Sequence, residues 1–290
     1  MGLLLRQILF YTELLSPEAF SFMSRMPKTI GAVQYLNTKP LVHGLAACGV
    51  DVVYDLPSRL SDRLASGELD VALIPSIELF RGRGYRMVSD ACIGCRGPVM
   101  SVKLFFRVPP WKTRTLALDE GSRTSASLAR ILLSERFGIT PFSESLAIGS
   151  GLEATNADAV LLIGDRAIGS PHERFEAVWD LGNEWVGFSG LPFVFAMWVA
   201  RQDVETESLA MVLAETRNRG EANLAAIAAA ESASHGLTVP QCLTYLRDNL
   251  HYHFGPQERL GLSTFYRYST SLGLAPIGFD CELATEGVLS

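Results

Sequence analysis

Short polar residues stand at four points of the sequence where an apolar run gives way to an amphipathic stretch. They are Asn37-Thr38, Pro75-Ser76, Ser122-Arg123-Thr124-Ser125 and Gly164-Asp165. Beyond the carboxyl ends of parallel strands, the first turns of helices present unpaired N–H groups and the positive end of the helix dipole, which suit an anion. Any one of these turns could equally be a helix cap, because Ser, Thr, Asn and Asp are the preferred capping residues. If all four face one cleft, they predict a cradle for a small anionic ligand.

Of the four turns, the first and the third contain the side chains best suited to contact a ligand. We expect Asn37 to end a strand with its amide in the cleft, Thr38 to cap the following helix and Pro40 to fix that helix's first turn. Lys39 is either a surface charge or a partner for a carboxylate. In the third turn, Arg123 stands among hydroxyls at a helix start, where a guanidinium can grip a carboxylate through two hydrogen bonds. Phosphate would satisfy the same groups.

No familiar cofactor or metal signature accompanies these turns. The sequence contains no Gly-rich dinucleotide fingerprint, no GxxxxGK[ST] phosphate loop, no HExxH and no GxSxG. His251 and His253 could chelate a metal but have no obvious third ligand. Cys92-Ile-Gly-Cys95 is a lone CxxC that fits buried thiols better than a redox pair. We therefore expect binding or catalysis by side chains and backbone alone, with no cofactor and no metal.

The composition is that of an ordinary folded protein. The chain has 290 residues, of which 48% are apolar and 19% are charged, and its net charge is −6. This charge offers no extended basic surface, so we expect no nucleic-acid partner. The five cysteines lack the spacing of a disulfide framework or a zinc site, which suits free thiols in a reducing compartment.

The N-terminus is apolar enough to suggest export, but its pattern differs from that of a secretory signal. Arg6, Glu13 and Glu18 interrupt the apolar run, and no small-residue cleavage site follows it. We infer neither a signal nor a membrane span and treat residues 1–26 as an extension ahead of the first core strand. The expected location is the cytoplasm.

Short apolar runs alternate with longer amphipathic stretches, as in βαβ units around a largely parallel sheet. Expected strands lie at 29–36, 50–57, 69–75, 97–109, 115–122, 139–145, 158–165 and 193–200. Expected helices lie at 41–49, 58–68, 76–82, 125–138, 166–171, 207–232, 238–250 and 257–273, and a loop rich in Gly and Trp precedes the last strand.

The long strands around 99–108 and 193–200 bracket the second series of units and could carry the chain to a second lobe and back. We therefore expect an α/β fold of two lobes with a ligand cleft between them. Residues 27–105 and 196–290 would form the first, discontinuous lobe, and residues 106–195 the second.

Six segments of the sequence together resemble one known family. They are IGAVQYLNTKPL, GELDVALIPSIE, GCRGPVMSVKLF, SRTSASLARILLSERFG, AVLLIGDRAI and DLGNEW followed by SGLPFVFAMWVAR. In this combination and order they resemble the chorismate dehydratases of the futalosine route to menaquinone, over roughly residues 28–270. The resemblance implies a two-lobed fold like that of type II periplasmic solute-binding proteins, used as an enzyme.

The implied reaction removes water from chorismate and yields 3-[(1-carboxyvinyl)oxy]benzoate. Chorismate carries two carboxylates, a ring hydroxyl at C4 and an enolpyruvyl ether on the adjacent carbon. Loss of the hydroxyl with the neighbouring ring proton makes the ring aromatic, so the driving force lies in the substrate. The protein has to favour this elimination over rearrangement and over loss of pyruvate, by positioning and electrostatics.

The resemblance also implies site residues. Asn37 and Ser76 match strand-end positions implied to act in catalysis, with Asn37 near the departing hydroxyl. Asp165 would either cap a helix or orient the substrate. The residues implied to bind the substrate are Thr38, Gly97, Pro98, Ser101, Thr124, Ser125, Asp165, Gly190, Leu191 and Pro192. Of these, the Gly190-Leu191-Pro192 segment would shape the wall against the ring.

A general base is not evident. Asp119, Glu120 and Asp165 stand at plausible strand ends, although a surface or capping role suits each of them. We hypothesise that the enolpyruvyl carboxylate of the substrate itself accepts the proton, with the protein holding the geometry.

Three other functions stay open. The sister enzyme 1,4-dihydroxy-6-naphthoate synthase shares the two-lobed fold, but the YLNTKP turn and the GPVMS segment favour the dehydratase. A solute-binding protein that feeds a transporter would need a cleavable signal or a lipid-anchored cysteine. Prephenate dehydratase would show a Thr-Arg-Phe stretch that this sequence lacks. The expected partner is chorismate alone, and the expected assembly is a monomer or a homodimer.

Overall fold

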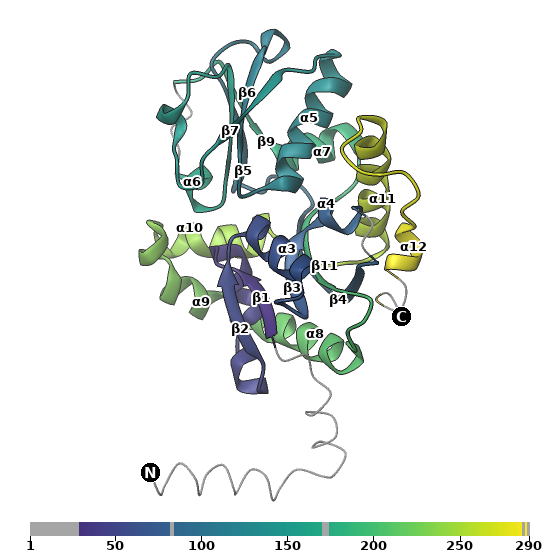
Figure 1. Ribbon diagram of the computed structural model, residues 1–290. Helices are drawn as coiled ribbons and strands as arrows, with labels where there is room; N and C mark the ends of the chain where they lie inside the picture. The colour runs from purple at the N-terminus through teal and green to yellow at the C-terminus, as the bar shows by residue number, and fades with distance from the viewer. Residues whose placement is uncertain (1–28, 82–83, 170–173, 286–287, 289–290) are drawn as a thin grey trace, which may run out of the picture.

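The computed structural model describes residues 29–81, 84–169, 174–285 and 288. In these residues the chain builds two α/β lobes, one above the other in Figure 1, and it passes between them twice. The extension expected at residues 1–26 lies outside the described residues.

In chain order, the first lobe opens with β1 (Thr29–Val33), η1 (Leu36–Val42), η2 (Leu45–Cys48), β2 (Asp51–Asp55), α3 (Pro57–Ser66), β3 (Val71–Pro75), α4 (Ser76–Leu79) and β4 (Arg86–Cys95). The second lobe contains β5 (Val102–Phe106), η3 (Pro110–Lys112), β6 (Thr115–Asp119), α5 (Arg123–Phe137), β7 (Phe142–Leu146), η4 (Leu152–Ala154), β8 (Ala159–Ile163), α6 (Asp165–Ile168), β9 (Ala177–Asp180) and α7 (Leu181–Ser189). The chain then returns through β10 (Phe193–Ala200), α8 (Glu207–Ala222), α9 (Leu224–Glu231), η5 (Ala233–His235), α10 (Val239–Thr244), η6 (Tyr245–Asn249), β11 (His251–His253), α11 (Pro256–Ser271) and α12 (Cys281–Ala284). Within the described ranges, no helix is long and apolar enough to cross a bilayer.

Each lobe is built on one mixed sheet. The strand order is β11-β4-β10-β3-β1-β2 in the first lobe and β7-β6-β8-β5-β9 in the second. β1 pairs in parallel with β2 and β3, but β10 runs antiparallel to both β3 and β4, and β5 to both β8 and β9. The expectation of a largely parallel sheet is therefore wrong. A strand buried on both faces is a continuous apolar run in either direction, so its pattern does not reveal which way it runs.

The chain crosses between the lobes at residues 96–101, from β4 to β5, and at residues 190–192, from α7 to β10. β5 already belongs to the second sheet, and β10 already belongs to the first. The chain therefore passes from one sheet to the other a few residues before the lobe boundaries expected at 105–106 and 195–196. The strand expected from residue 97 begins only at Val102, after Met100 adopts a left-handed backbone with φ 61°. β4 was not expected, because Ser89, Asp90 and Gly94 interrupt its apolar pattern.

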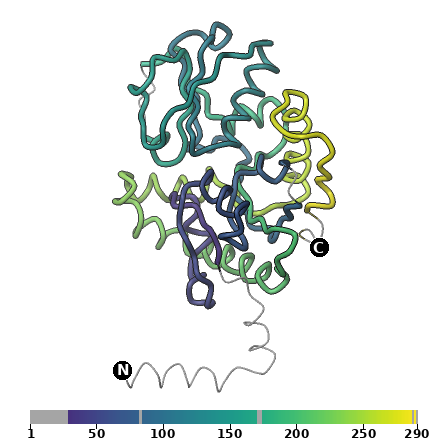
Figure 2. The backbone as a smooth tube through the Cα atoms, in the orientation of Figure 1, coloured from purple at the N-terminus to yellow at the C-terminus, as the bar shows by residue number. Residues whose placement is uncertain are grey.

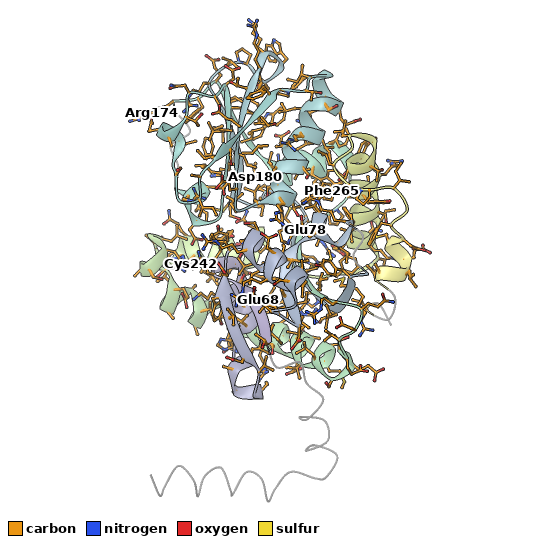
Figure 3. All side chains as sticks on the ribbon, viewed as in Figure 1. Glu68, Glu78, Arg174, Asp180, Cys242 and Phe265 are labelled. Atoms are coloured by element: carbon orange, nitrogen blue, oxygen red, sulfur yellow. The ribbon has the colours of Figure 1, made fainter. Side chains whose placement is uncertain are left out.

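Helix α7 occupies residues that were expected to form a loop. Asp180 caps it by accepting hydrogen bonds from the N–H groups of Gly182 and Asn183, both at 3.1 Å. The same carboxylate accepts from the N–H groups of Val99 at 2.9 Å and Met100 at 2.6 Å, in the first crossing. In Figure 3, Asp180 lies at the lower part of the second lobe, towards the first. One half-buried carboxylate thus fixes both the helix and the crossing segment.

The segment that carries Asn37 rests on α8. β1 ends at Val33, and residues 36–42 form the 3₁₀ helix η1, so Asn37 lies inside a helix and not at a strand end as expected. A Cβ atom on Gly220 of α8 would lie only 2.0 Å from the carbonyl oxygen of Pro40. Only glycine lets the two backbones approach so closely, and this approach sets the position of η1.

Helix α11 supports the boundary between the lobes. It was expected at residues 257–273 and is present at Pro256–Ser271, so this prediction is confirmed. Figure 2 shows the C-terminal segment rising beside the second lobe, although it follows directly from the first. A Cβ atom on Gly261 would lie 2.2 Å from the carbonyl oxygen of Pro192, so α11 packs tightly against the second crossing.

The two cysteines of the CxxC motif lie in β4 with no accessible surface. Burial raises the pKa of the Cys95 thiol to about 12 and raises the pKa of the Cys92 thiol strongly as well. Of the five cysteines, all of them free, only Cys48 is partly exposed. We therefore expect a thiol reagent to modify about one cysteine per chain in the native protein and all five after denaturation, because buried neutral thiols are unreactive. Rapid modification of Cys92 or Cys95 in the native protein, located by peptide mass spectrometry, would contradict this.

Candidate functional site

A pocket lies between the lobes and takes its walls from both of them. It encloses about 510 Å³ of space, part of which opens to solvent. Its walls consist of Val33, Tyr35, Asn37, Pro57, Pro75, Ile93, Phe195 and Ala196 from the first lobe, and of Val99, Ser101, Val102, Ser122, Ser125, Ile163 and Gly164 from the first crossing and the second lobe. None of these residues is charged. Apolar walls with a few converging hydroxyl and amide groups suit a small ring compound with polar substituents.

The first turn of α5 lies at the pocket, where Ser122 and Ser125 form part of the wall. The Ser122 hydroxyl caps the helix by accepting from the N–H of Ser125 at 3.3 Å, and it donates to the Ser125 hydroxyl at 2.7 Å. The N–H groups of Arg123 and Thr124 have no hydrogen-bond partner within the described residues. Two free N–H groups at the start of a 15-residue helix attract negative charge through the helix dipole.

Asn37 and Ser101 also line the pocket. The Asn37 side-chain oxygen accepts a hydrogen bond from the Thr38 hydroxyl at 3.3 Å. Ser101 is buried, and its carbonyl oxygen accepts from the N–H of Gly164 at 2.8 Å, which joins the crossing to the start of α6. Among the residues expected from the sequence, the structure thus brings Asn37, Ser101 and Ser125 together in one pocket.

Three expected residues lie behind the pocket wall instead. Thr38 bonds to the Asn37 side chain and does not cap a helix, because η1 has no side-chain cap. The Ser76 hydroxyl donates to the carbonyl oxygen of Val194 at 2.8 Å and lies 3.4 Å from the Thr124 hydroxyl oxygen. That Thr124 oxygen also accepts from the N–H of Ile77 at 3.2 Å. Ser76 and Thr124 therefore join α4 to α5 across the lobes, and neither hydroxyl faces the pocket.

The remaining expected residues belong to the two crossings. In the first, the carbonyl oxygen of Pro98 accepts from the Asn249 side chain at 2.9 Å, and a Cβ atom on Gly182 would lie 2.7 Å from the carbonyl oxygen of Gly97. In the second, Gly190 ends α7 with φ 71°, and the indole N–H of Trp185 donates to the carbonyl oxygen of Pro192 at 3.1 Å. These residues, with Leu191, connect the lobes; none of them is among the residues that line the pocket.

Arg123 does not point at the pocket as expected. Its guanidinium binds both carboxylate oxygens of Asp62, at 2.8 and 2.9 Å, and one oxygen of Glu78 at 3.3 Å. Both acids belong to the first lobe, and Figure 3 shows Glu78 at the boundary between the lobes. The expectation that Arg123 grips a ligand carboxylate is therefore corrected, because its guanidinium links the two lobes.

Asp165 forms a second link between the lobes. Gly164, not Asp165, is the cap of α6, and one Asp165 carboxylate oxygen pairs with Nδ1 of His235 at 2.7 Å. The other nitrogen of His235 lies 3.5 Å from Glu231, which also pairs with Lys39 at 3.0 Å. In Figure 1, this region corresponds to α6 lying directly above α9 and α10. Lys39 therefore has a carboxylate partner within the protein.

Tyr35, which the sequence analysis did not select, forms part of the pocket wall. Its ring fits against Gly164, where a Cβ atom would lie 3.2 Å from two ring carbons and where the backbone has φ 66°. Burial, followed by the nearby Asp119 carboxylate, raises the pKa of the Tyr35 hydroxyl to about 12. The tyrosine therefore stays protonated at neutral pH. Its position depends on a glycine more than a hundred residues away, so no local pattern points to it.

The other candidate acids are engaged within the second lobe. Asp119 is buried and pairs with Arg166, and its second oxygen accepts from the N–H of Gly121 at 2.9 Å. Burial raises the pKa of Asp119, and Arg166 opposes that shift only in part. Glu120 accepts a hydrogen bond from the Ser145 hydroxyl on the edge strand β7. Neither carboxylate lines the pocket.

The two histidines considered as metal ligands make other contacts. His253 bonds to Glu221 at 2.7 Å, and His251 lies 3.4 Å from Glu258. In the part of the chain that the structure describes, no group of three or more His, Cys, Asp or Glu side chains is arranged to hold a metal ion.

Comparison with known proteins gives one family and one fold. The menaquinone biosynthesis family matches residues 28–271. The chain is 34% identical over 267 residues to the chorismate dehydratase of Thermus thermophilus, which covers 86% of this chain and 96% of that protein. Among solved structures, a protein from Archaeoglobus fulgidus matches with a TM-score of 0.69 at 17% identity, covering 85% of this chain and 97% of that one. The periplasmic aliphatic sulphonate binding protein of Escherichia coli matches with a TM-score of 0.60 at 15% identity, covering 90% and 98%. The solute-binding-protein-like fold expected from the sequence is thereby confirmed.

Proposed function

Because the chain belongs to the chorismate dehydratase family of menaquinone biosynthesis, we infer that it is a hydro-lyase that converts chorismate to 3-[(1-carboxyvinyl)oxy]benzoate. The observation that carries this conclusion is the 34% identity to a chorismate dehydratase over 86% of the chain. The matched residues include both lobes and both crossings, and therefore every wall of the pocket.

The pocket fits the chemistry of this substrate. We propose that one chorismate carboxylate lies at the first turn of α5, against the free N–H groups of Arg123 and Thr124 and the Ser125 hydroxyl. The apolar side chains of the walls would enclose the ring. Asn37 and Ser101, which line the same pocket, would then face the ring substituents, including the hydroxyl that departs. None of the described residues that line the pocket is a cation, so the helix dipole and oriented N–H groups would hold the negative charge.

The elimination breaks the bond between C4 and its hydroxyl and the C–H bond on the adjacent carbon that carries the ether. We propose that the enolpyruvyl carboxylate of the substrate accepts the C–H proton and then passes this proton to the departing hydroxyl, which leaves as water. Asn37 would stabilise the departing oxygen by hydrogen bonding. Preorganised donors of this kind lower a barrier because they need no rearrangement as charge develops.

A substrate-derived base predicts that no protein carboxylate is indispensable. We expect Asp119→Asn, Glu120→Gln and Asp165→Asn each to retain turnover within about 100-fold of the wild type, with Glu120→Gln nearly unchanged. Asp119→Asn removes half of a buried ion pair with Arg166, so its thermal stability should fall while its residual turnover persists. A loss of more than about a thousandfold in one of these variants, with its fold intact, would identify that residue as the base.

The test of the function is to incubate the purified protein with chorismate and to follow 3-[(1-carboxyvinyl)oxy]benzoate by liquid chromatography and mass spectrometry. Enzyme-dependent formation of this product supports the proposal. Thermal stabilisation by chorismate without product would favour a solute-binding protein, and no response to chorismate at all would favour the sister activity, 1,4-dihydroxy-6-naphthoate synthase. The expected cytoplasmic location, the absence of a cofactor and a monomeric or homodimeric assembly stay predictions.

A further inference from the structure

One buried tyrosine lies next to the pocket without a completed hydrogen bond. Tyr245 has no accessible surface, and its hydroxyl makes no hydrogen bond of good geometry with any described residue. A buried hydroxyl without a partner is costly, so such groups in folded proteins generally serve a purpose. Asn37 and Ser101 approach this hydroxyl closely enough to lower its pKa, although burial raises that pKa by more. The tyrosine hydroxyl therefore lies close to two side chains of the pocket wall.

The backbone around Tyr245 is unusual. Residues Tyr245–Asn249 form η6, a single turn of π-helix that follows α10. Such turns are rare and occur often at functional sites, because the inserted residue redirects the side chains around it. At the far end of η6, the Asn249 side chain donates to the carbonyl oxygen of Pro98 at 2.9 Å. The turn thus holds the first crossing at Pro98, three residues before Ser101.

Asn37 also has a neighbour that fixes one side of its amide. Its side-chain oxygen accepts from the Thr38 hydroxyl at 3.3 Å, a long and therefore weak hydrogen bond. Within the described residues, this is the only hydrogen bond of good geometry that the Asn37 side chain makes, and the Ser101 hydroxyl makes none. A second fixed group next to both side chains would hold them in place before the substrate binds.

We propose that Tyr245 is a positioning residue, whose hydroxyl holds the Asn37 amide and the Ser101 hydroxyl from behind the pocket wall so that both face the departing oxygen of the substrate. The hydrogen bonds that are incomplete in the ligand-free protein become complete when the substrate fixes Asn37 and Ser101 from the other side. Tyr245 does not line the pocket, so it acts through these two residues and not on the substrate. The proposal rests on the dehydratase activity proposed above.

The test is the substitution Tyr245→Phe, which removes a single oxygen atom. Because that oxygen is buried and has no completed hydrogen bond, the melting temperature should stay the same or rise. We expect kcat for chorismate dehydration to fall by about 10- to 100-fold, since small misplacements of reacting groups cost about this much, with KM changed by less than about threefold. If Tyr245 had a role in folding alone, its replacement would change the melting temperature and would not lower kcat while leaving KM nearly unchanged.

Tyr252→Phe is the matched control. Tyr252 is 1% exposed, and its hydroxyl is likewise buried without a hydrogen-bond partner in the described chain. The groups that influence its pKa are Tyr245, Glu221 and Cys242, none of which lines the pocket. This variant removes the same atom from the same kind of environment, so we expect its kcat to stay within about twofold of the wild type.

A third variant separates positioning from direct contact. If Tyr245 acts through Asn37, the double variant with Asn37→Ala and Tyr245→Phe should be only slightly slower than Asn37→Ala alone, because coupled residues are not additive. Three results would each overturn the inference while leaving the dehydratase proposal in place. They are a wild-type kcat in Tyr245→Phe, equal losses of kcat in Tyr245→Phe and Tyr252→Phe, and a loss of kcat in the double variant equal to the product of the losses in Asn37→Ala and Tyr245→Phe. No product from the wild-type protein would overturn both.

Discussion

Replacing Asn37 by alanine is expected to lower kcat/KM for chorismate by about 100- to 1,000-fold, which is the usual effect of removing one preorganised hydrogen-bond donor from an active site. Among the described residues that line the pocket, Asn37 has the only amide side chain. Within the described residues, its side chain makes one hydrogen bond of good geometry, which it accepts from the Thr38 hydroxyl at a long 3.3 Å, so its loss should change the melting temperature little. Steady-state kinetics with thermal unfolding as a check on the fold measure both effects.

Gln34→Ala is the control for this variant. Gln34 is an exposed amide three residues earlier in the same segment, and it does not line the pocket. Its replacement should leave kcat/KM within about twofold of the wild type, as is usual for surface substitutions. If Asn37→Ala keeps more than a tenth of the wild-type kcat/KM, Asn37 has no catalytic role and the elimination must rely on other groups.

Replacing Gly220 by alanine is expected to lower the free energy of unfolding by about 3 kcal/mol, at the upper end of the range for overpacking. The added methyl group would lie 2.0 Å from the carbonyl oxygen of Pro40 and 2.6 Å from its carbonyl carbon. Both atoms are backbone, so no side chain can turn aside to make room. Helix α8 and η1 must separate, and Asn37 moves with η1. Denaturant titration should show the loss of stability, and kinetics should show a fall in kcat in the fraction that stays folded.

Gly187→Ala provides the contrast. Gly187 lies inside α7, and an added Cβ atom would meet no heavy atom within 4 Å. Alanine is a better helix former than glycine by roughly 1 kcal/mol, so this variant should be as stable as the wild type or more stable. Equal stability of Gly220→Ala and the wild type would show that α8 does not set the position of η1.

The sequence predicted those parts of the site that rest on local chemistry. Ser122 precedes an amphipathic run of helical period, and this predicted a helix start with free N–H groups, which the structure has at α5. Asn37 and Ser101 stand in short polar segments next to apolar runs, and both line the pocket. Local patterns were sufficient in these places because a cap and its helix lie within a few residues of each other.

The sequence did not predict the parts that depend on contacts between distant residues. Arg123 was expected to face the ligand, but its partner Asp62 lies 61 positions earlier, in the other lobe. Asp165 was expected to cap a helix or orient the substrate, and its partner His235 lies 70 positions later. No spacing rule connects such pairs, because only the arrangement of the two lobes brings them together. Tyr35 and Tyr245 were missed for the same reason.

Strand direction was the other part that the sequence left undetermined. The apolar run of β10 is continuous and all eight of its residues are buried, which is equally compatible with parallel and antiparallel neighbours. β10 runs antiparallel to both of its neighbours, because it brings the chain back from the second lobe. The pattern of residues showed that a strand was present, and the path of the chain determined which way it runs.

The central claim is that the pocket between the lobes is where chorismate loses water, and the most direct measurement is a crystal structure of the protein with 3-[(1-carboxyvinyl)oxy]benzoate bound. We predict that the product lies in this pocket, with one carboxylate at the N–H groups of Arg123 and Thr124 and its ring between the two lobes, within reach of Asn37 and Ser101. Product bound anywhere else, with this pocket empty, would contradict the account.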